Sequence, residues 1–367
     1  MKKTILYLLI STLILPTWGK NEKYNLLIGT YTNTGKSEGI YSYEIDMTKG
    51  EFVRKSVAKG VNNPSYLAIS PDKKYVYSVS ETPDGSAAKS FLFDKNTSVL
   101  TFLNASLTKS GGPCYISTSE KHVFTANYGG GSISVFGRKP DGSLTDVLQV
   151  IQHTGGSINK KRQNEPHVHQ AIISPDNKYL IVNDLGTDNV TVYKYNPKAE
   201  NDILIPFDTL AVKQGSGPRH ATFTKDGKKL YLVQEIDGTV SVLGVSDGKL
   251  SLIQETTLVK KKDIVTGAAD IHLSSDEKFV YATNRGTAND ITCFSVAKDG
   301  KLTFVQQLAT GGKGPRNFAI SPNGKHLFVA HQITDNIVIF KRDKKTGKLT
   351  DTEKRIEVGS PVCLVFY

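Results

Sequence analysis

Residues 168–185 read VHQAIISPDNKYLIVNDL, and residues 218–235 read PRHATFTKDGKKLYLVQE. Each stretch alternates apolar and polar residues, turns at an Asp-Asn or Asp-Gly pair, and then alternates again. A period of two on both sides of such a turn is typical of a β-hairpin. The pattern recurs at 64–81, 113–128, 268–285 and 315–332, and Asp176, Asp226 and Asp276 are spaced by 50 residues. The chain is therefore an internal repeat, and the repeat decides the fold.

Further strands follow each hairpin. A third strand is predicted at 190–195, 239–245, 291–296 and 337–341, and a fourth at 250–254, 302–307 and 349–356. Four antiparallel strands in a repeat of about fifty residues are typical of one β-propeller blade. Six units are explicit, and a seventh is divided between the chain ends, with 361–367 as its first strand and 24–30 and 39–46 as later ones. We expect an all-β, seven-bladed β-propeller with four antiparallel strands per blade, its ring closed by the N- and C-terminal strands.

The first residues do not follow the repeat. Two lysines near the start precede an almost entirely apolar run from Ile5 to Leu15, and Pro16–Gly19 and a polar segment come next. This order predicts a secretory signal peptide over residues 1–19, and the run is too short to span a bilayer. We expect a single propeller domain over residues 20–367. The protein is expected to be exported, periplasmic or secreted, with no stable membrane insertion after cleavage.

Charge and cysteine content narrow the possible partners. The net charge is +11, but many lysines lie in predicted turns such as Asp72-Lys73-Lys74, which favours a solvated surface over a nucleic-acid site. Cys114, Cys293 and Cys363 form no C-x-x-C pair, so we expect neither a disulfide framework nor a zinc ribbon. The sequence leaves the oligomeric state open.

Polar residues gather at one end of the repeat. In a propeller the first strand of a blade lies nearest the axis, and its start meets the end of the antiparallel second strand at one mouth of the channel. The second position of the units holds Ser65, Cys114, His169, Arg219, Ala269, Arg316 and Val362. The last two positions of the following strand hold Ser80-Glu81, Asn127-Tyr128, Asp184-Leu185, Gln234-Glu235, Asn284-Arg285 and His331-Gln332. Turn chemistry favours Gly, Asn, Asp or Ser at such places, and does not explain His, Arg and Glu.

These two columns predict a functional site at one mouth of the ring. We expect catalytic groups at His169, Arg219, Glu235 and Arg285, and substrate contacts at His167, His220, Asn284, Arg316, Asn127, Glu81 and His331. A structural alternative is a salt-bridge network that closes the ring, with Glu235 on Arg219 or Arg285 and His169 on a backbone carbonyl.

A metal site is a further alternative at the same place. His167 and His169 are two residues apart on a strand, so their side chains share a face, and Glu165 or Asp184 would complete a ligand set. Neighbouring arginines repel a cation and disfavour this alternative. We therefore expect no metal and no other cofactor.

At these residues the chain resembles a known family. The segments PHVHQAIISPDNKYLIVNDLGTDNVTVYKY, GPRHATFTKDGKKLYLVQEIDGTVSV, AADIHLSSDEKFVYATNR and GPRNFAISPNGKHLFVAHQITDNIVIF are similar to the lactonase, seven-bladed β-propeller family. That family includes bacterial 6-phosphogluconolactonases and fungal carboxy-muconate cyclases. The resemblance extends from about Tyr24 to Tyr367 and implies that His169, Arg219, Glu235 and Arg285 are the active-site groups.

The resemblance also implies an activity, which is metal-independent hydrolysis of an anionic aldonolactone, first of all 6-phosphogluconolactone. Arg219 and Arg285 would stabilise the oxyanion, and either His169 or Glu235 would accept the proton of the attacking water. The alternatives are a cyclase of the muconate type and a non-catalytic propeller that binds sugar acids or proteins. The predicted export signal departs from the family pattern, because the sugar-phosphate pathway is cytosolic.

Overall fold

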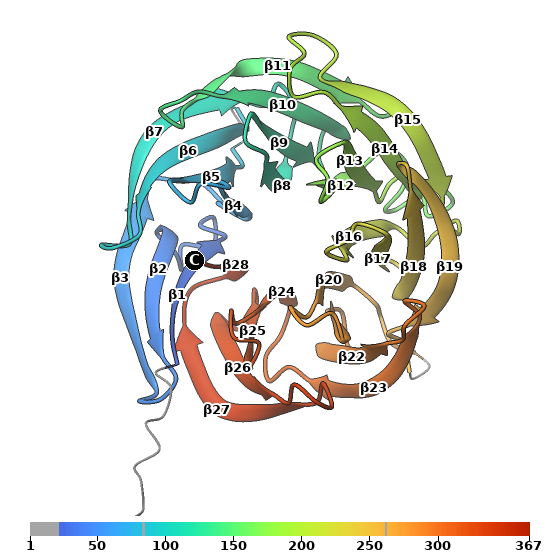
Figure 1. Ribbon diagram of the computed structural model, residues 1–367. Coiled ribbons are helices and arrows are strands. Elements are labelled where there is room, and N and C mark those ends of the chain that lie inside the picture. The colour runs from blue at the N-terminus through green and yellow to red at the C-terminus, as the bar shows by residue number, and fades with distance from the viewer. Residues whose placement is uncertain (1–21, 83–84, 261–262) are drawn as a thin grey trace, which may run out of the picture.

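A ring of seven four-stranded antiparallel sheets surrounds a central axis (Figure 1). The computed structural model describes residues 22–82, 85–260 and 263–367. The predicted seven-bladed propeller is thereby confirmed. The predicted signal peptide over residues 1–19 lies outside the described residues. Within the described residues, no helix is long and apolar enough to cross a membrane.

The blades follow one another around the ring in chain order, and the seventh combines both ends of the chain. Its strands are β28 (Pro361–Phe366), β1 (Lys23–Thr30), β2 (Gly39–Asp46) and β3 (Glu51–Lys59). The next three blades are β4 (Leu67–Ile69), β5 (Tyr75–Ser80), β6 (Ala87–Asp94) and β7 (Val99–Leu107); β8 (Pro113–Thr118), β9 (His122–Asn127), β10 (Ser132–Arg138) and β11 (Leu144–Gln152); and β12 (Val168–Ile173), β13 (Tyr179–Asp184), β14 (Asn189–Tyr195) and β15 (Leu204–Ala211). The last three are β16 (Pro218–Phe223), β17 (Lys229–Gln234), β18 (Thr239–Ser246) and β19 (Lys249–Thr257); β20 (Ala268–Leu273), β21 (Phe279–Asn284), β22 (Asp290–Val296) and β23 (Leu302–Ala309); and β24 (Pro315–Ile320), β25 (His326–His331), β26 (Asn336–Arg342) and β27 (Leu349–Glu357).

The turn that joins the first and second strands of a blade explains the repeated Ser-Pro-Asp sequence. The Ser174 hydroxyl donates a hydrogen bond of 2.6 Å to the Asp176 carboxylate, which accepts the Lys178 amide at 3.2 Å. Asn177 then adopts a left-handed backbone with φ 57°, a conformation that Asn and Gly tolerate best. The turn residues therefore fix where each hairpin reverses.

Ring closure depends on pairing between the two ends of the chain. Strand β28 pairs antiparallel with β1, with Leu364 opposite Ile28 and Val365 opposite Leu27. Leu26, Leu27 and Ile28 are fully buried. The prediction that the terminal strands share one blade is confirmed, and the pairing covers edges that would otherwise be open.

Neighbouring blades are also joined by buried tyrosines. The hydroxyls of Tyr77 and Tyr231 each donate a hydrogen bond of 3.1 Å to a glycine carbonyl in a turn of the next blade, and Tyr281 repeats this contact at 2.6 Å. All three side chains are inaccessible to solvent. The same contact therefore ties together three pairs of neighbouring blades.

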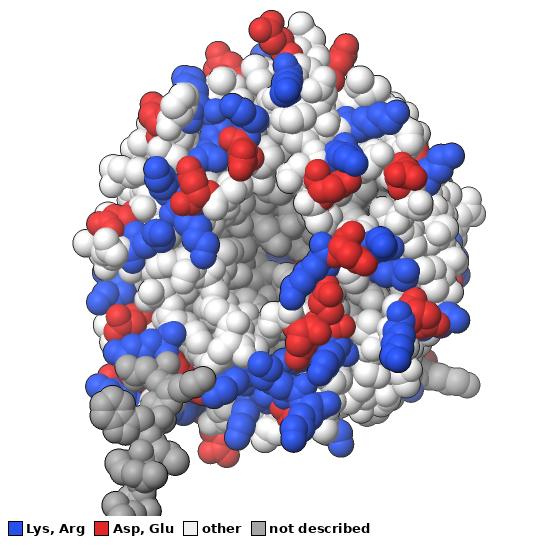
Figure 2. Space-filling model, viewed as in Figure 1, with Lys and Arg blue, Asp and Glu red and all other residues white. Residues whose placement is uncertain are grey.

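The surface carries both signs of charge. On the face shown in Figure 2, Lys and Arg side chains lie among Asp and Glu side chains around the ring, and the centre is hollowed. Cys114, Cys293 and Cys363 are buried and form no disulfide.

Candidate active site

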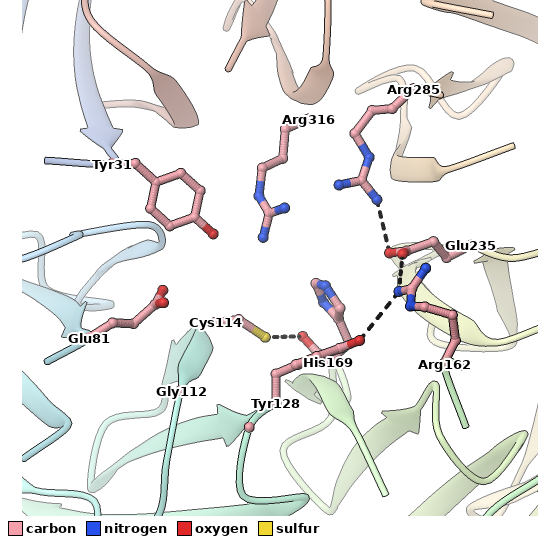
Figure 3. A pocket seen from close by; sticks show the side chains of 11 residues that line it. Tyr31, Glu81, Gly112, Cys114, Tyr128, Arg162, His169, Glu235, Arg285 and Arg316 are labelled. Atoms are coloured by element: carbon pink, nitrogen blue, oxygen red, sulfur yellow. Dashed lines mark hydrogen bonds and ion pairs between the residues drawn. The ribbon is translucent and has the colours of Figure 1, made fainter. Parts of the chain in front are cut away.

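A cavity of ≈ 340 Å³ opens where the first two strands of several blades meet at the axis (Figure 3). Its walls come from all seven blades and from the loop before β12. The lining residues are Tyr31, Glu81, Gly112, Cys114, Tyr128, Gly129, Arg162, His169, Glu235, Arg285 and Arg316. The structure therefore brings together three of the four predicted catalytic residues along the cavity wall, and the fourth, Arg219, lies directly behind Glu235.

Strand alternation allows only one of two adjacent column residues to reach the cavity. Successive side chains of a strand point to opposite faces, so the last two positions of each second strand cannot both face the axis. Glu81, Glu235 and Arg285 follow immediately after β5, β17 and β21, and line the cavity. Asn127 and Asn284, one position earlier, are fully buried and do not line it.

Two of the penultimate residues, Asn127 and Asn284, have hydrogen-bond partners within their own blades. The Asn127 amide nitrogen donates to the hydroxyls of Ser132 at 3.0 Å and Ser134 at 2.9 Å. The Asn284 carbonyl oxygen accepts the Gly267 amide at 3.0 Å. His331 is fully buried, and neither of its ring nitrogens finds a hydrogen-bond partner among the described residues. The structure does not bring these three side chains to the cavity.

Glu235 is the centre of an ion-pair cluster. One carboxylate oxygen lies 2.6 Å from Arg162 Nη2, and the other lies 2.8 Å from Arg219 Nε and 2.9 Å from Arg285 Nη2. Burial opposes ionisation of this carboxyl, but the guanidinium charges outweigh burial and hold the pKa of Glu235 well below its usual range. Glu235 is therefore a fixed anion that organises arginines, and a weak acceptor of protons.

The cluster contains the Glu235–Arg219 and Glu235–Arg285 ion pairs expected of a salt-bridge network that closes the ring. Arg162 and Arg285 extend this network along the cavity wall. Arg219 is buried, and its Nη1 also donates to the Ala269 carbonyl. Arg285 donates from Nε to the Gly267 carbonyl at 2.8 Å. Burial lowers the pKa of Arg285 to about 10, so its guanidinium stays charged at neutral pH.

His169 lies on the cavity wall between two aromatic rings. Its ring is edge-on to Tyr128, with centroids 5.6 Å apart, and to His220, at 5.0 Å. Its Nδ1 is buried, with no hydrogen-bond partner among the described residues, so the expected backbone carbonyl does not hold it. Burial, followed by the charge of Arg219, lowers the pKa of His169 well below 6.5, so the imidazole is neutral at neutral pH.

Glu81, Tyr31 and Arg316 follow one another along another part of the cavity wall, and Arg316 lies next to Arg285 (Figure 3). The Arg316 guanidinium carbon lies 5.4 Å from the centroid of the Tyr31 ring. The described ion pairs of the cavity all involve Glu235, and Arg316 takes part in none of them. The Ser65 hydroxyl donates to Glu81 Oε1 at 2.7 Å, and burial raises the pKa of Glu81.

The remaining predicted contacts lie next to the cavity. His220 Nδ1 donates a 2.8 Å hydrogen bond to the Asp270 carboxylate. Burial lowers the pKa of His220 to about 4. The His167 ring stacks on Tyr128 with centroids 4.4 Å apart, and its Nδ1 lies 3.0 Å from the Tyr128 carbonyl oxygen. Neither His167 nor His220 lines the cavity.

The metal alternative has no geometric support. No group of three His, Cys, Asp or Glu side chains suited to a metal ion occurs within 22–82, 85–260 and 263–367. Asp184, one of the two proposed further ligands, instead accepts the His167 backbone amide at 2.8 Å and contacts His153 Nδ1 at 2.8 Å.

Six residues of the cavity wall were not among the predicted site residues: Tyr31, Gly112, Cys114, Tyr128, Gly129 and Arg162. Cys114 and Tyr128 stand in the two columns of polar positions, and of the others Tyr31 and Arg162 have the reactive side chains. Tyr31 follows β1 and occupies the same position as Glu81 and Glu235, but its blade is divided between the chain ends, so its column was incomplete. Arg162 lies in the irregular segment before β12, where no repeat predicts its place. Extending the column to the seventh blade would have found Tyr31.

The chemistry of the cavity is cationic. Three arginines line it against two carboxylates, and a fourth arginine pairs with Glu235 from behind. Burial raises the pKa of the Cys114 thiol to about 12, so this residue is protonated and is not an activated nucleophile. The arrangement suits binding of an anion and stabilisation of negative charge that develops on a bound molecule.

Fold and cavity together define a seven-bladed propeller with a cationic site at one mouth of the ring. The family model described as Lactonase, 7-bladed beta-propeller matches residues 25–366, and the chain belongs to this family. The 6-phosphogluconolactonase of Bacillus subtilis (strain 168) is 34% identical over 351 residues, which are 94% of this chain and 98% of that protein.

Solved structures agree with the family assignment. The periplasmic gluconolactonase of Pseudomonas aeruginosa is 37% identical, with a TM-score of 0.90 over 94% of this chain and 99% of that one. A protein of Bacteroides fragilis is 44% identical, with a TM-score of 0.90 over 94% of this chain and 98% of that one.

Proposed function

We propose that this protein hydrolyses a negatively charged sugar lactone without a metal ion, with 6-phosphogluconolactone as the leading substrate. The observation that carries the proposal is the convergence of Arg162, Arg285 and Arg316 on one cavity, where Glu235 pairs with the first two and Arg316 has no carboxylate partner among the described ion pairs. Membership of the lactonase family and similarity to a protein named 6-phosphogluconolactonase support it.

The arginines supply the two interactions that the reaction needs. Attack of water on the ring carbonyl creates an oxyanion, and a fixed guanidinium such as that of Arg285 stabilises this charge without reorganising. Arg316, which has no carboxylate partner among the described ion pairs, is available for the phosphate or another anionic group of the substrate. A lactone is a reactive ester, so the proposal needs no Lewis acid.

His169 and Glu235 have supporting roles in this proposal. Glu235 holds Arg162, Arg219 and Arg285 in a fixed arrangement, because one carboxylate contacts all three. His169 is neutral and lines the cavity, so a ring N–H can donate a hydrogen bond to the oxyanion.

We further propose that the protein acts outside the cytoplasm. The predicted signal peptide motivates this location, and the similar gluconolactonase of Pseudomonas aeruginosa is described as periplasmic. An exported enzyme of this kind would act on lactones that form or arrive outside the cell.

The test is the rate of 6-phosphogluconolactone hydrolysis by the purified protein in excess EDTA, corrected for spontaneous ring opening. We expect clear acceleration that the chelator does not reduce. The proposal is refuted if the protein accelerates hydrolysis of neither this lactone nor any other aldonolactone. Binding of sugar acids without turnover would then identify a non-catalytic module, and turnover of muconate-type substrates alone would identify a cyclase.

A further inference from the structure

Two blades carry a glutamate at the same structural position. Glu81 follows β5 and Glu235 follows β17, and both side chains line the cavity. In each blade the partner comes from the second position of the repeat, which is Ser65 for Glu81 and Arg219 for Glu235. The scaffold is shared, so the difference between the two carboxyls arises from their neighbours.

The neighbours give the two carboxyl groups opposite properties. Glu235 contacts three guanidinium groups, whereas Glu81 has a neutral hydroxyl at 2.7 Å and no ion pair among the described residues. The titratable and charged groups that face Glu81 are Arg316, Tyr31 and Cys114. The attraction of Arg316 and the Ser65 hydrogen bond do not outweigh burial, so the pKa of Glu81 is raised while that of Glu235 is lowered.

The geometry places Glu81 where a proton acceptor is needed. Figure 3 shows its carboxylate pointing into the cavity from the wall opposite Glu235 and Arg285. Ser65 holds Oε1, and Oε2 accepts no hydrogen bond from the described residues. A substrate held by Arg285 and Arg316 therefore has this oxygen on the side of the cavity away from the ion-pair cluster.

We propose that Glu81 is the general base that activates water for attack on the lactone. This inference rests on the proposed lactone hydrolysis and assigns a catalytic residue within that site. Environments that separate two carboxyls in this way are a recurring means of assigning acid and base roles.

The proton transfers balance within one turnover. Glu81 takes a proton from water as the water oxygen bonds to the carbonyl carbon, and the carbonyl electron pair moves onto oxygen. When the tetrahedral intermediate collapses, the bond to the ring oxygen breaks, and the protonated Glu81 returns its proton to that oxygen. Glu81 is again a carboxylate, and the product is a hydroxy acid, which loses its acidic proton to solvent.

The test compares Glu81→Gln, Ser65→Ala and a matched control, Glu51→Gln, in the full chain. Glu51 lies on the outer strand β3 with its side chain 61% exposed, far from the ring axis. We expect Glu81→Gln to lower kcat by about 10²–10⁴-fold, to lose the acidic limb of the pH–rate profile, and to keep the affinity for the aldonic acid product. Glu51→Gln should match the wild type.

Ser65→Ala supplies a readout that a purely structural role would not move. The Ser65 hydrogen bond lowers the pKa of Glu81, so removing it should raise this pKa and shift the acidic limb to higher pH. A wild type that opens lactones, with a Glu81→Gln variant that keeps both rate and acidic limb, would overturn the base assignment alone. A wild type that opens no lactone would overturn the proposed function and the base role with it.

Discussion

His169 is buried on the wall of a cavity that arginines line, and its chemistry follows from that place. Burial and the nearby positive charges keep the imidazole neutral at neutral pH. A neutral ring beside developing negative charge acts as a hydrogen-bond donor, since it has one N–H and carries no charge to neutralise. In the proposed mechanism its contribution is electrostatic stabilisation, and proton transfer belongs to Glu81.

We predict that His169→Phe, which keeps the ring shape and removes the donor, lowers kcat by about 10²–10³-fold. His169→Gln, which restores a donor, should recover part of the loss. The pH–rate profile should keep its wild-type shape between about pH 5.5 and 7.5, because His169 does not titrate there. Kinetics of both variants across this range measure the effect. A variant profile that loses an inflection would instead show that His169 exchanges protons.

At the scale of strands, the Arg219–Glu235 pair connects β16 to the residue that follows β17, and Arg219 also reaches β20 through the Ala269 carbonyl. Both side chains are buried, so each charge depends on the other for solvation. Arg162 contacts the same carboxylate, but its side chain is 42% exposed. Loss of Arg219 should therefore lower the free energy of unfolding more than loss of Arg162.

We predict that Arg219→Ala lowers the free energy of unfolding by about 3–5 kcal/mol, because it leaves a buried carboxylate without its inner partner. Arg162→Ala should lower it by less, about 1 kcal/mol, because the Arg162 side chain is 42% exposed and solvent screens its attraction to Glu235. Chemical denaturation of both variants gives the comparison. Equal losses would show that the cluster is more open to solvent than its burial indicates.

The strands and the columns of polar residues were predictable because every blade repeats the same alternation and turn. The sequence did not reveal which of two adjacent column residues faces the axis, and Asn127 and Asn284 proved to face the blade interior. That choice depends on where each strand ends relative to the channel, which alternation alone leaves open. Arg162 lies outside the repeat, so only the folded chain shows that it reaches Glu235.

The ring as a whole buries histidines that must stay neutral. Burial lowers the pKa values of His220 and His331 to about 4, below the value of about 6.5 for an unfolded chain. The unfolded chain therefore binds these protons first, and stability that is fully present above about pH 6.5 is lost as pH falls toward 4. Each histidine contributes on the order of 3 kcal/mol to this loss at the acid limit.

We predict that the melting temperature falls between about pH 6.5 and 4, and that His331→Leu reduces this fall. His331 has no hydrogen-bond partner among the described residues, so an apolar side chain in its place should also stabilise the protein at neutral pH. Thermal denaturation at several pH values measures both effects. An unchanged pH dependence in the variant would show that His331 is solvated in the folded protein.

The central claim is that this propeller opens an anionic lactone in the arginine-lined cavity at one mouth of the ring. The most direct measurement is kcat/KM for 6-phosphogluconolactone and for unphosphorylated gluconolactone, in EDTA, with the wild type and Arg316→Ala. We predict that the wild type prefers the phosphorylated lactone and that the variant loses about 10–100-fold of that preference, the value of a charged hydrogen bond. Equal preference in both proteins, or no catalysis of either lactone, would contradict the account.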